Sequence, residues 1–287
     1  MEIKESQYNF SEMHQRMQFY VDAGILPCCA TAVFKGTDLV DHQTFGFMDL
    51  ETREPLRDDA IYRMASNTKL VTSVALMMLQ EEGLFDLDDP LAKFRPEFGE
   101  LQVLQPDATT AADVHPAKNL ISIRHLLSHS AGLSYGFVEP DSVIDQCYLN
   151  GGVNGLGEKD IDLEELCAGI AKLPLAFEPG TSWRYSFATD VCARLVEVLS
   201  GQSFDAFLRQ RIFDPLGMMD TDFWVPQEKA HRLITMYSPE DLFDPMKPGL
   251  NKADDVITGP YRARPKMLSG GGGLVSTVAD YSAFLRM

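Results

Sequence analysis

The sequence predicts an α+β fold, in which an antiparallel strand pair is joined to a larger number of helices. Two short apolar runs at 29–35 and 43–49 flank a turn around Gly36, which is the pattern of a β-hairpin. Apolar residues at helical spacing recur in separate stretches, of which 66–82 and 190–200 are the clearest. A strand pair combined with several such helices indicates an α+β arrangement.

The other elements follow in chain order. Residues 8–24 are predicted to form the first helix, and 61–64 a brief extended piece. The helix at 66–82 is apolar over most of its circumference, so we expect it to be buried and central. Further helices are predicted at 123–128, 162–172, 204–212 and, behind a Thr277 cap, 278–287, with irregular structure over 226–266.

Composition and charge narrow the class of protein. The 287 residues are 45% hydrophobic and 23% charged, which is ordinary for one large globular domain or two lobes and excludes disorder, collagen and coiled coil. With 25 basic against 42 acidic residues the net charge is −17, so the chain should repel phosphate backbones and anionic membranes. We therefore expect no nucleic-acid partner. No apolar run reaches the roughly 20 residues of a membrane span, and we expect no membrane association.

The five cysteines, at 28, 29, 147, 167 and 192, indicate the cellular compartment. Their odd number and scattered spacing, together with a polar N-terminus that is not a secretory signal, predict reduced thiols and a cytoplasmic protein. Adjacent Cys28 and Cys29 could serve metal or redox chemistry. Small buried cysteines at the start of an apolar strand are the better interpretation.

The first candidate for chemistry is Ser66-Asn67-Thr68-Lys69 at a helix start. Residues three apart share one helix face, so the Ser66 hydroxyl and the Lys69 amine can meet. A serine hydroxyl is a weak nucleophile that needs a nearby base, and a lysine can be that base. The alternative is a helix cap with a surface lysine. A lysine at the start of an otherwise buried helix favours the functional interpretation, because burying it without a purpose is costly.

A tyrosine, a histidine pair and a glycine run are the other candidates for chemistry. Tyr185 follows a Pro-Gly turn and precedes a helix, so it could act as a base or proton relay, although a packed tyrosine is the commoner case. His125 and His129 have the spacing of a metal pair, but no third ligand is evident and we interpret them as structural. We expect no metal and no cofactor.

The glycine run at 270–273 lacks the G-K-[ST] of a phosphate loop and is expected to allow close backbone packing.

Taken together, six segments resemble the serine β-lactamase and penicillin-binding-protein-like superfamily, and most closely its β-lactamase-related esterases, the family VIII carboxylesterases. They are spread over nearly the whole chain, at 64–69, 125–133, 178–181, 185–186, 215–221 and 270–277. The resemblance implies a single catalytic unit with an antiparallel sheet flanked by helices, a mostly helical lobe beside it, and the active site between them. Residues 1–65 and 266–287 would belong to the α/β lobe and 66–265 to the helical lobe.

The resemblance also assigns roles. Ser66 would be the acylated nucleophile, Lys69 its base partner and Tyr185 the third catalytic group. Phe187 stands where lactam- and peptide-cleaving relatives carry an asparagine, which shifts the expected substrate from a lactam to an apolar ester. Tyr135 is expected to face the cleft, with packing as the alternative.

A third motif that the family carries on a strand near its C-terminus does not follow residue 277. We therefore expect the last strands of the sheet to lie in a further segment of a longer protein or in a second chain, and 1–287 alone to be poorly active or insoluble.

Three functions remain open. The first is a serine carboxylesterase acting on a small-molecule ester. The second keeps the same chemistry for a β-lactam, a D-amino peptide or acyl transfer to an alcohol. The third is a non-catalytic binding protein on the same fold, which the intact Ser66, Lys69 and Tyr185 oppose.

Overall fold

Strands and helices are both present, as the sequence predicts. The computed structural model describes residues 3–4, 8–153, 161–253 and 261–287. The chain divides into two units. The first comprises Met1–Arg63, Ile212–Arg264 and Val275–Met287, and the second comprises Met64–Arg211 and Pro265–Leu274.

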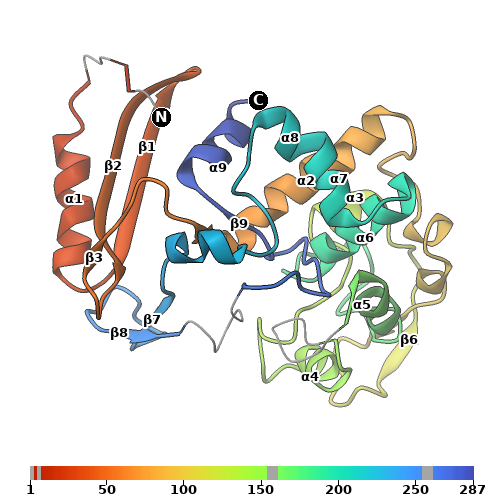
Figure 1. Cartoon of the computed structure of the whole chain (residues 1–287). Helices are drawn as coiled ribbons and strands as arrows, with labels where there is room; N and C mark the ends of the chain where they lie inside the picture. The colour runs from red at the N-terminus through yellow and green to blue at the C-terminus, as the bar shows by residue number, and fades with distance from the viewer. Residues whose placement is uncertain (1–2, 5–7, 154–160, 254–260) are drawn as a thin grey trace. The chain divides into compact units, whose positions relative to one another are not determined.

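The first unit is built on an antiparallel sheet in the order β1-β2-β3, formed by β1 (Cys28–Lys35), β2 (Asp38–Asp49) and β3 (Glu54–Pro55). This confirms the predicted hairpin. Helices α1 (Ser11–Asp22) and α9 (Val278–Leu285) lie on either side of it (Figure 1). The sheet is therefore flanked by helices, and its first strand begins at the two adjacent cysteines. All five cysteines are free, and burial raises the pKa of Cys28 to about 11.

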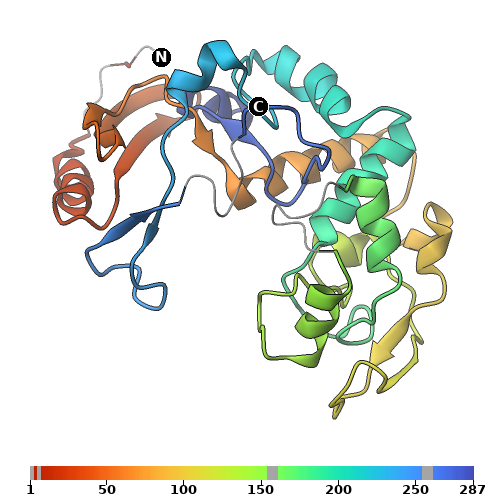
Figure 2. The ribbon, with the colours of Figure 1, turned by 60° about the horizontal axis from the view of Figure 1, so that its bottom comes forward.

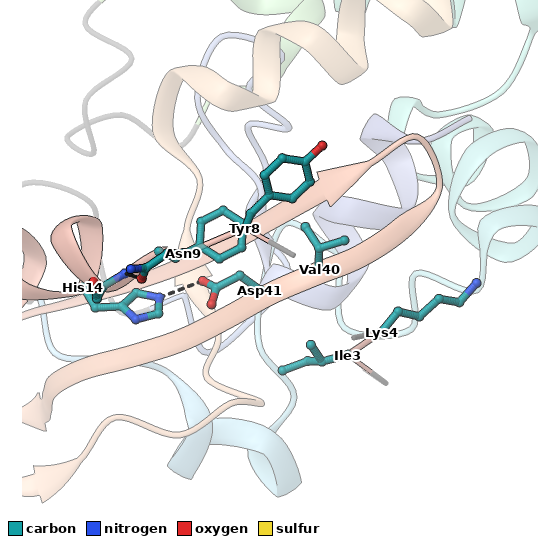
Figure 3. A pocket seen from close by; sticks show the side chains of 9 residues that line it. Ile3, Lys4, Tyr8, Asn9, His14, Val40 and Asp41 are labelled. Atoms are coloured by element: carbon teal, nitrogen blue, oxygen red, sulfur yellow. Dashed lines mark hydrogen bonds and ion pairs between the residues drawn. The ribbon is translucent and has the colours of Figure 1, made fainter. Parts of the chain in front are cut away.

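Residues near the N-terminus, among them Lys4, Tyr8 and His14, line a surface hollow beside β2 (Figure 3). The backbone N–H of Lys4 donates to the carbonyl oxygen of Leu39, and the Lys4 ammonium pairs with Asp38 at 2.5 Å. From α1, His14 Nε2 lies 2.9 Å from Oδ2 of the buried Asp41 on β2. These contacts tie Lys4 and α1 to strand β2.

Two further strand pairs complete the first unit. Strand β4 (Tyr62–Arg63) pairs with β9 (Val275–Ser276). Strand β7 (Tyr237–Pro239) pairs with β8 (Leu250–Lys252) and forms the blue hairpin in Figure 2. The sequence-based division placed 66–265 together in the helical lobe, whereas the structure groups 212–264 with the sheet. The reason is visible in the backbone, since Ile61 donates to the carbonyl oxygen of Arg232 and Asp222 exchanges hydrogen bonds with Val275.

The second unit is mostly helical and is organised around α6 (Ala188–Ser200). The helices α2 (Thr68–Glu81), α3 (Ile123–Leu127), α5 (Leu163–Ile170) and α7 (Phe204–Leu208) all pack on it. Helix α2 was expected to be the buried central helix, but it buries one face and leaves Leu70 51% exposed. The more deeply buried helix is α6, because neighbours cover it from several directions.

Several helices begin or end at other residues than predicted. The first turn of the 66–82 helix is a separate 3-10 turn, η1 (Ala65–Asn67), before α2 begins. The predicted helix at 204–212 is α7 followed by a π-helical turn, η4 (Arg209–Phe213). The remaining elements of the unit are η2 (Leu91–Lys93), η3 (Pro96–Phe98), β5 (Gln102–Leu104), β6 (Val114–Pro116) and α4 (Val143–Asn150). The first unit also holds α8 (Asp214–Leu216) and η5 (Gln227–Arg232). Across the described ranges, no helix has the length and apolar character needed to span a bilayer.

Candidate active site

Three polar side chains singled out in the sequence meet in the second unit. The Ser66 hydroxyl lies 2.6 Å from the Tyr185 hydroxyl, and the Lys69 ammonium donates to Ser66 Oγ at 3.2 Å. Lys69 Nζ also donates to the carbonyl oxygen of Gly271 at 2.5 Å and lies 4.7 Å from the centre of the Tyr185 ring. The Ser66 hydroxyl is therefore held between two groups that can exchange its proton.

Local backbone geometry presents Ser66 at the start of α2. Ser66 lies in the η1 turn and is exposed, while Lys69 lies one turn further along the same face. Ala65, immediately before the serine, has φ of +43°, a conformation that costs a residue with a side chain about 1 kcal/mol or more. The helix N-terminus adds a partial positive charge beside the hydroxyl, which favours an anion forming there.

Tyr185 is positioned by the segment that leads from Gly180 into α6. Gly180 begins this segment with φ of +85°, and a Cβ there would lie 2.8 Å from His125 Nε2. Arg184 then fixes the backbone, because its N–H donates to the carbonyl oxygen of His129 and its guanidinium donates to Ser134 Oγ at 2.8 Å. The Arg184 side chain thus anchors the segment, while the hydroxyl of the neighbouring Tyr185 lies 2.6 Å from Ser66 Oγ.

An aromatic wall stands beside the three polar groups. Tyr135 is buried, and its ring centre lies 5.3 Å from that of Tyr185. Phe187 is 4% exposed and packs against Tyr135 at 4.4 Å, so it lies behind Tyr135 and supports it. Two aromatics that the sequence analysis did not select are exposed here. Phe137 stacks on Tyr135, and Trp183, 65% exposed, stacks on Tyr185.

His129 is the residue of the site that sequence reasoning missed most clearly. Its ring centre lies 5.0 Å from that of Tyr185, and its Nδ1 lies 3.2 Å from Ser186 Oγ. Burial, assisted by the charge of Lys69, lowers its pKa to about 4, so the ring is neutral at neutral pH. His125, in contrast, is structural as predicted. It takes part in the capping box of α3, in which Ser122 N–H donates to its Nδ1.

The glycine run allows close packing, as the sequence predicts. A Cβ at Gly270 would lie 2.6 Å from Ala193 Cβ, and one at Gly271 would lie 2.7 Å from the Tyr135 hydroxyl. The role of Gly271 as an acceptor for Lys69 was not anticipated, because a backbone carbonyl leaves no signal in a sequence.

The meeting of serine, lysine and tyrosine side chains at a helix start, in a fold of strands and helices, agrees with the family resemblance drawn from the sequence. A family model described as Beta-lactamase matches residues 13–287, and the chain belongs to that family.

Two curated relatives and one solved structure illustrate the similarity. Protein Rv1367c of Mycobacterium tuberculosis (strain ATCC 25618 / H37Rv) is 34% identical over 93% of this chain and 63% of its own length. Esterase EstB of Burkholderia gladioli is 30% identical over 82% of this chain and 64% of its own length. The structure of EstCE1, described as a hydrolase with promiscuous acyltransferase activity, superposes with a TM-score of 0.79 at 24% identity, covering 94% of this chain and 69% of that one. The chain thus spans just under two thirds of the length of these curated relatives.

Proposed function

We propose that the protein is a serine hydrolase that cleaves carboxylic esters through an acyl-enzyme on Ser66. The observation that carries this proposal is the shared hydrogen bonding of one hydroxyl, which lies 2.6 Å from Tyr185 and 3.2 Å from Lys69. A serine hydroxyl becomes a useful nucleophile only when a neighbouring group removes its proton. Both candidate acceptors are in place without any rearrangement.

The reaction proceeds in two halves. Ser66 Oγ attacks the ester carbonyl carbon while its proton passes to Tyr185 in its phenolate form or to Lys69 in its neutral amine form. The tetrahedral intermediate then expels the alkoxide, which leaves as the alcohol after taking up that proton. In the second half, water attacks the acyl-enzyme and gives a proton to the same pair, and Ser66 is regenerated with release of the acid.

The surroundings favour an ester over a lactam. Tyr135, which Phe187 supports, gives the site an apolar wall, and Phe187 supplies no amide to hydrogen-bond the acyl side chain of a lactam or peptide. The name of Esterase EstB supports the same substrate class. A second candidate function is acyl transfer to an alcohol, which the description of EstCE1 as a hydrolase with promiscuous acyltransferase activity supports. This reaction needs only an alcohol in place of water in the second half of the mechanism.

The test compares an aryl ester with a chromogenic cephalosporin as substrates for the wild-type protein at its full natural length. We expect turnover of the ester, much slower turnover of the cephalosporin, and an increased rate of ester consumption when a small alcohol is added if acyl transfer operates. Ser66→Ala should abolish turnover. Ser73→Ala, on the same helix and outside the site, is the matched control and should retain it. Turnover that survives in Ser66→Ala would place the nucleophile elsewhere.

A further inference from the structure

Asp190, in the first turn of α6, is a buried carboxylate that the proposed mechanism leaves without a role. Its Oδ1 accepts two hydrogen bonds, from the Gly271 N–H at 3.0 Å and from the Ser269 hydroxyl at 2.6 Å. Burying a carboxylate is costly unless donors compensate it. Both donors come from one short segment, so the carboxylate serves to hold that segment.

The same segment is held from a second side. Thr72 Oγ1 on α2 donates to the carbonyl oxygen of Gly270 at 2.8 Å. Residues 269–271 are thus fixed between α6 and α2, and the carbonyl oxygen of Gly271 is left facing Lys69 Nζ at 2.5 Å. Asp190 binds the N–H of the residue whose carbonyl holds the Lys69 ammonium.

The fit at Gly271 is tight. A Cβ at this position would lie 2.6 Å from Asp190 Oδ2 and 2.7 Å from the Tyr135 hydroxyl, closer than real Cβ contacts come. A bare backbone is therefore needed for the Gly271 N–H to reach the carboxylate. The position of the Gly271 carbonyl then follows from the position of Asp190.

The electrostatic surroundings agree with this geometry. Burial raises the pKa of Asp190, while the hydrogen bonds from Ser269 and Gly271 and the charge of Lys69 act in the opposite direction. Asp190 in turn contributes to the raised pKa of Tyr135, whose main cause is burial. The carboxylate and the ammonium thus lie close enough to influence one another across Gly271.

We propose that Asp190 is a positioning residue for Lys69. By anchoring Gly271 it keeps the Lys69 amino group within reach of the Ser66 hydroxyl. This inference rests on the proposed function, in which Lys69 helps to move the Ser66 proton. It assigns Asp190 no contact with the substrate.

A double-mutant cycle tests the proposal. Asp190→Leu and Lys69→Ala are made singly and together, and each protein is assayed for aryl-ester turnover and for the rate of inactivation by a fluorophosphonate. Asp190→Leu should lower kcat about tenfold or more, with KM changed less than about twofold. In the Lys69→Ala background the same change should cost less than about threefold, because residues that act as one unit are non-additive. An equal loss in both backgrounds would overturn the proposal.

A conservative variant guards against misfolding of Asp190→Leu. Asp190→Asn keeps the side-chain volume and an acceptor oxygen, but an amide accepts a hydrogen bond less strongly than a carboxylate. We expect an intermediate loss of kcat, roughly threefold to tenfold, that disappears in the Lys69→Ala background. Unchanged kcat in Asp190→Asn would overturn the proposal.

The chain offers a matched control in Asp280 of the first unit. Its Oδ2 likewise accepts one backbone N–H, from Asp220 at 2.7 Å, and one hydroxyl, from Thr221 at 3.0 Å. Asp280→Asn should lower the melting temperature as Asp190→Asn does and leave kcat of the folded protein unchanged. An equal loss of kcat in both would show that general destabilisation is the cause. A wild-type protein without esterase turnover or fluorophosphonate labelling would remove the proposed function itself, whereas an active wild type with an additive cycle would remove only this inference.

Discussion

Lys69 Nζ lies 2.5 Å from the carbonyl oxygen of Gly271, a residue 202 positions further along the chain. The position of the ammonium is restricted further, because it also donates to Ser66 Oγ and lies against the Tyr185 ring. The geometry of the serine therefore depends on a backbone segment that contributes no functional side chain of its own.

This relationship predicts that alanine substitutions at the neighbouring Gly271 and Gly272 have very different effects on turnover. Gly271→Ala would bring a methyl group within 2.6 Å of Asp190 Oδ2, so the segment must shift and aryl-ester turnover should fall at least about tenfold. At Gly272 a methyl group would meet nothing closer than 3.8 Å, and Gly272→Ala serves as the matched control with only a mild effect. Ester kinetics and thermal melts on both variants check this. Equal behaviour of the two would contradict the packing argument.

Tyr185→Phe should separate chemistry from packing. The ring keeps its contacts with Tyr135 and His129, but the hydroxyl that lies 2.6 Å from Ser66 Oγ is lost. Loss of a proton-transfer group lowers rates by about 10²–10⁴, and we expect a decrease of kcat in this range with a nearly unchanged melting temperature. Tyr237→Phe is the control, because its hydroxyl accepts a hydrogen bond from Leu50 N–H in the first unit. Normal turnover in Tyr185→Phe would remove the tyrosine from the mechanism.

The effect of substituting Ala65 on the free energy of unfolding should depend on its positive φ angle. With φ of +43° it lies in the left-handed region, where glycine is tolerated and a β-branched side chain is not. We expect Ala65→Gly to keep or raise the free energy of unfolding, by up to about 1 kcal/mol, and Ala65→Val to lower it by at least about 1 kcal/mol. Urea unfolding curves measure both. A Val variant as stable as the wild type would show that this conformation is not required.

His129 should make the protein less stable in mild acid. Its pKa is about 4 in the folded protein, below the usual value of 6.5, because burial and the Lys69 charge disfavour its protonated form. Above pH 6.5 the ring is neutral in both states. As the pH falls from about 6.5 towards 4, the unfolded chain takes up a proton that the folded protein does not, so stability is lost over this window. His129→Gln should flatten that part of the melting-temperature profile. Identical slopes for the two proteins between pH 7 and 4.5 would contradict the assignment.

The sequence was informative where the determinants are local. Ser66 and Lys69 are three residues apart on one turn, so their meeting could be predicted from spacing, and the Thr277 cap of α9 was likewise found, with its side chain accepting from Asp280 N–H. Tyr185 was a candidate because it lies between a Pro-Gly turn and a helix, and the resemblance to a known family then favoured a catalytic role over a packing role.

The parts that were missed depend on distant partners. Asp190 was included only as the first residue of the helix expected at 190–200, because its donor Gly271 lies 81 positions away. Helix α4 was not predicted, since its short segment carries a buried Asp145, which is compensated by the ion pair with Arg184 and by hydrogen bonds from the Ser134 hydroxyl and the Glu139 N–H. The structure groups 212–264 with the sheet, which differs from the sequence-based division, because the residues that pair with this stretch lie far away in the chain.

The central claim is that Ser66 is the nucleophile, and the most direct measurement is the site of covalent modification. The protein is treated with a fluorophosphonate, digested and mapped by mass spectrometry, with Ser66→Ala and Ser73→Ala treated in parallel. We predict one adduct, on Ser66, that is absent from Ser66→Ala and present in Ser73→Ala, with loss of aryl-ester turnover in proportion to labelling. An adduct on another residue, or full turnover in a protein fully labelled at Ser66, would contradict the account.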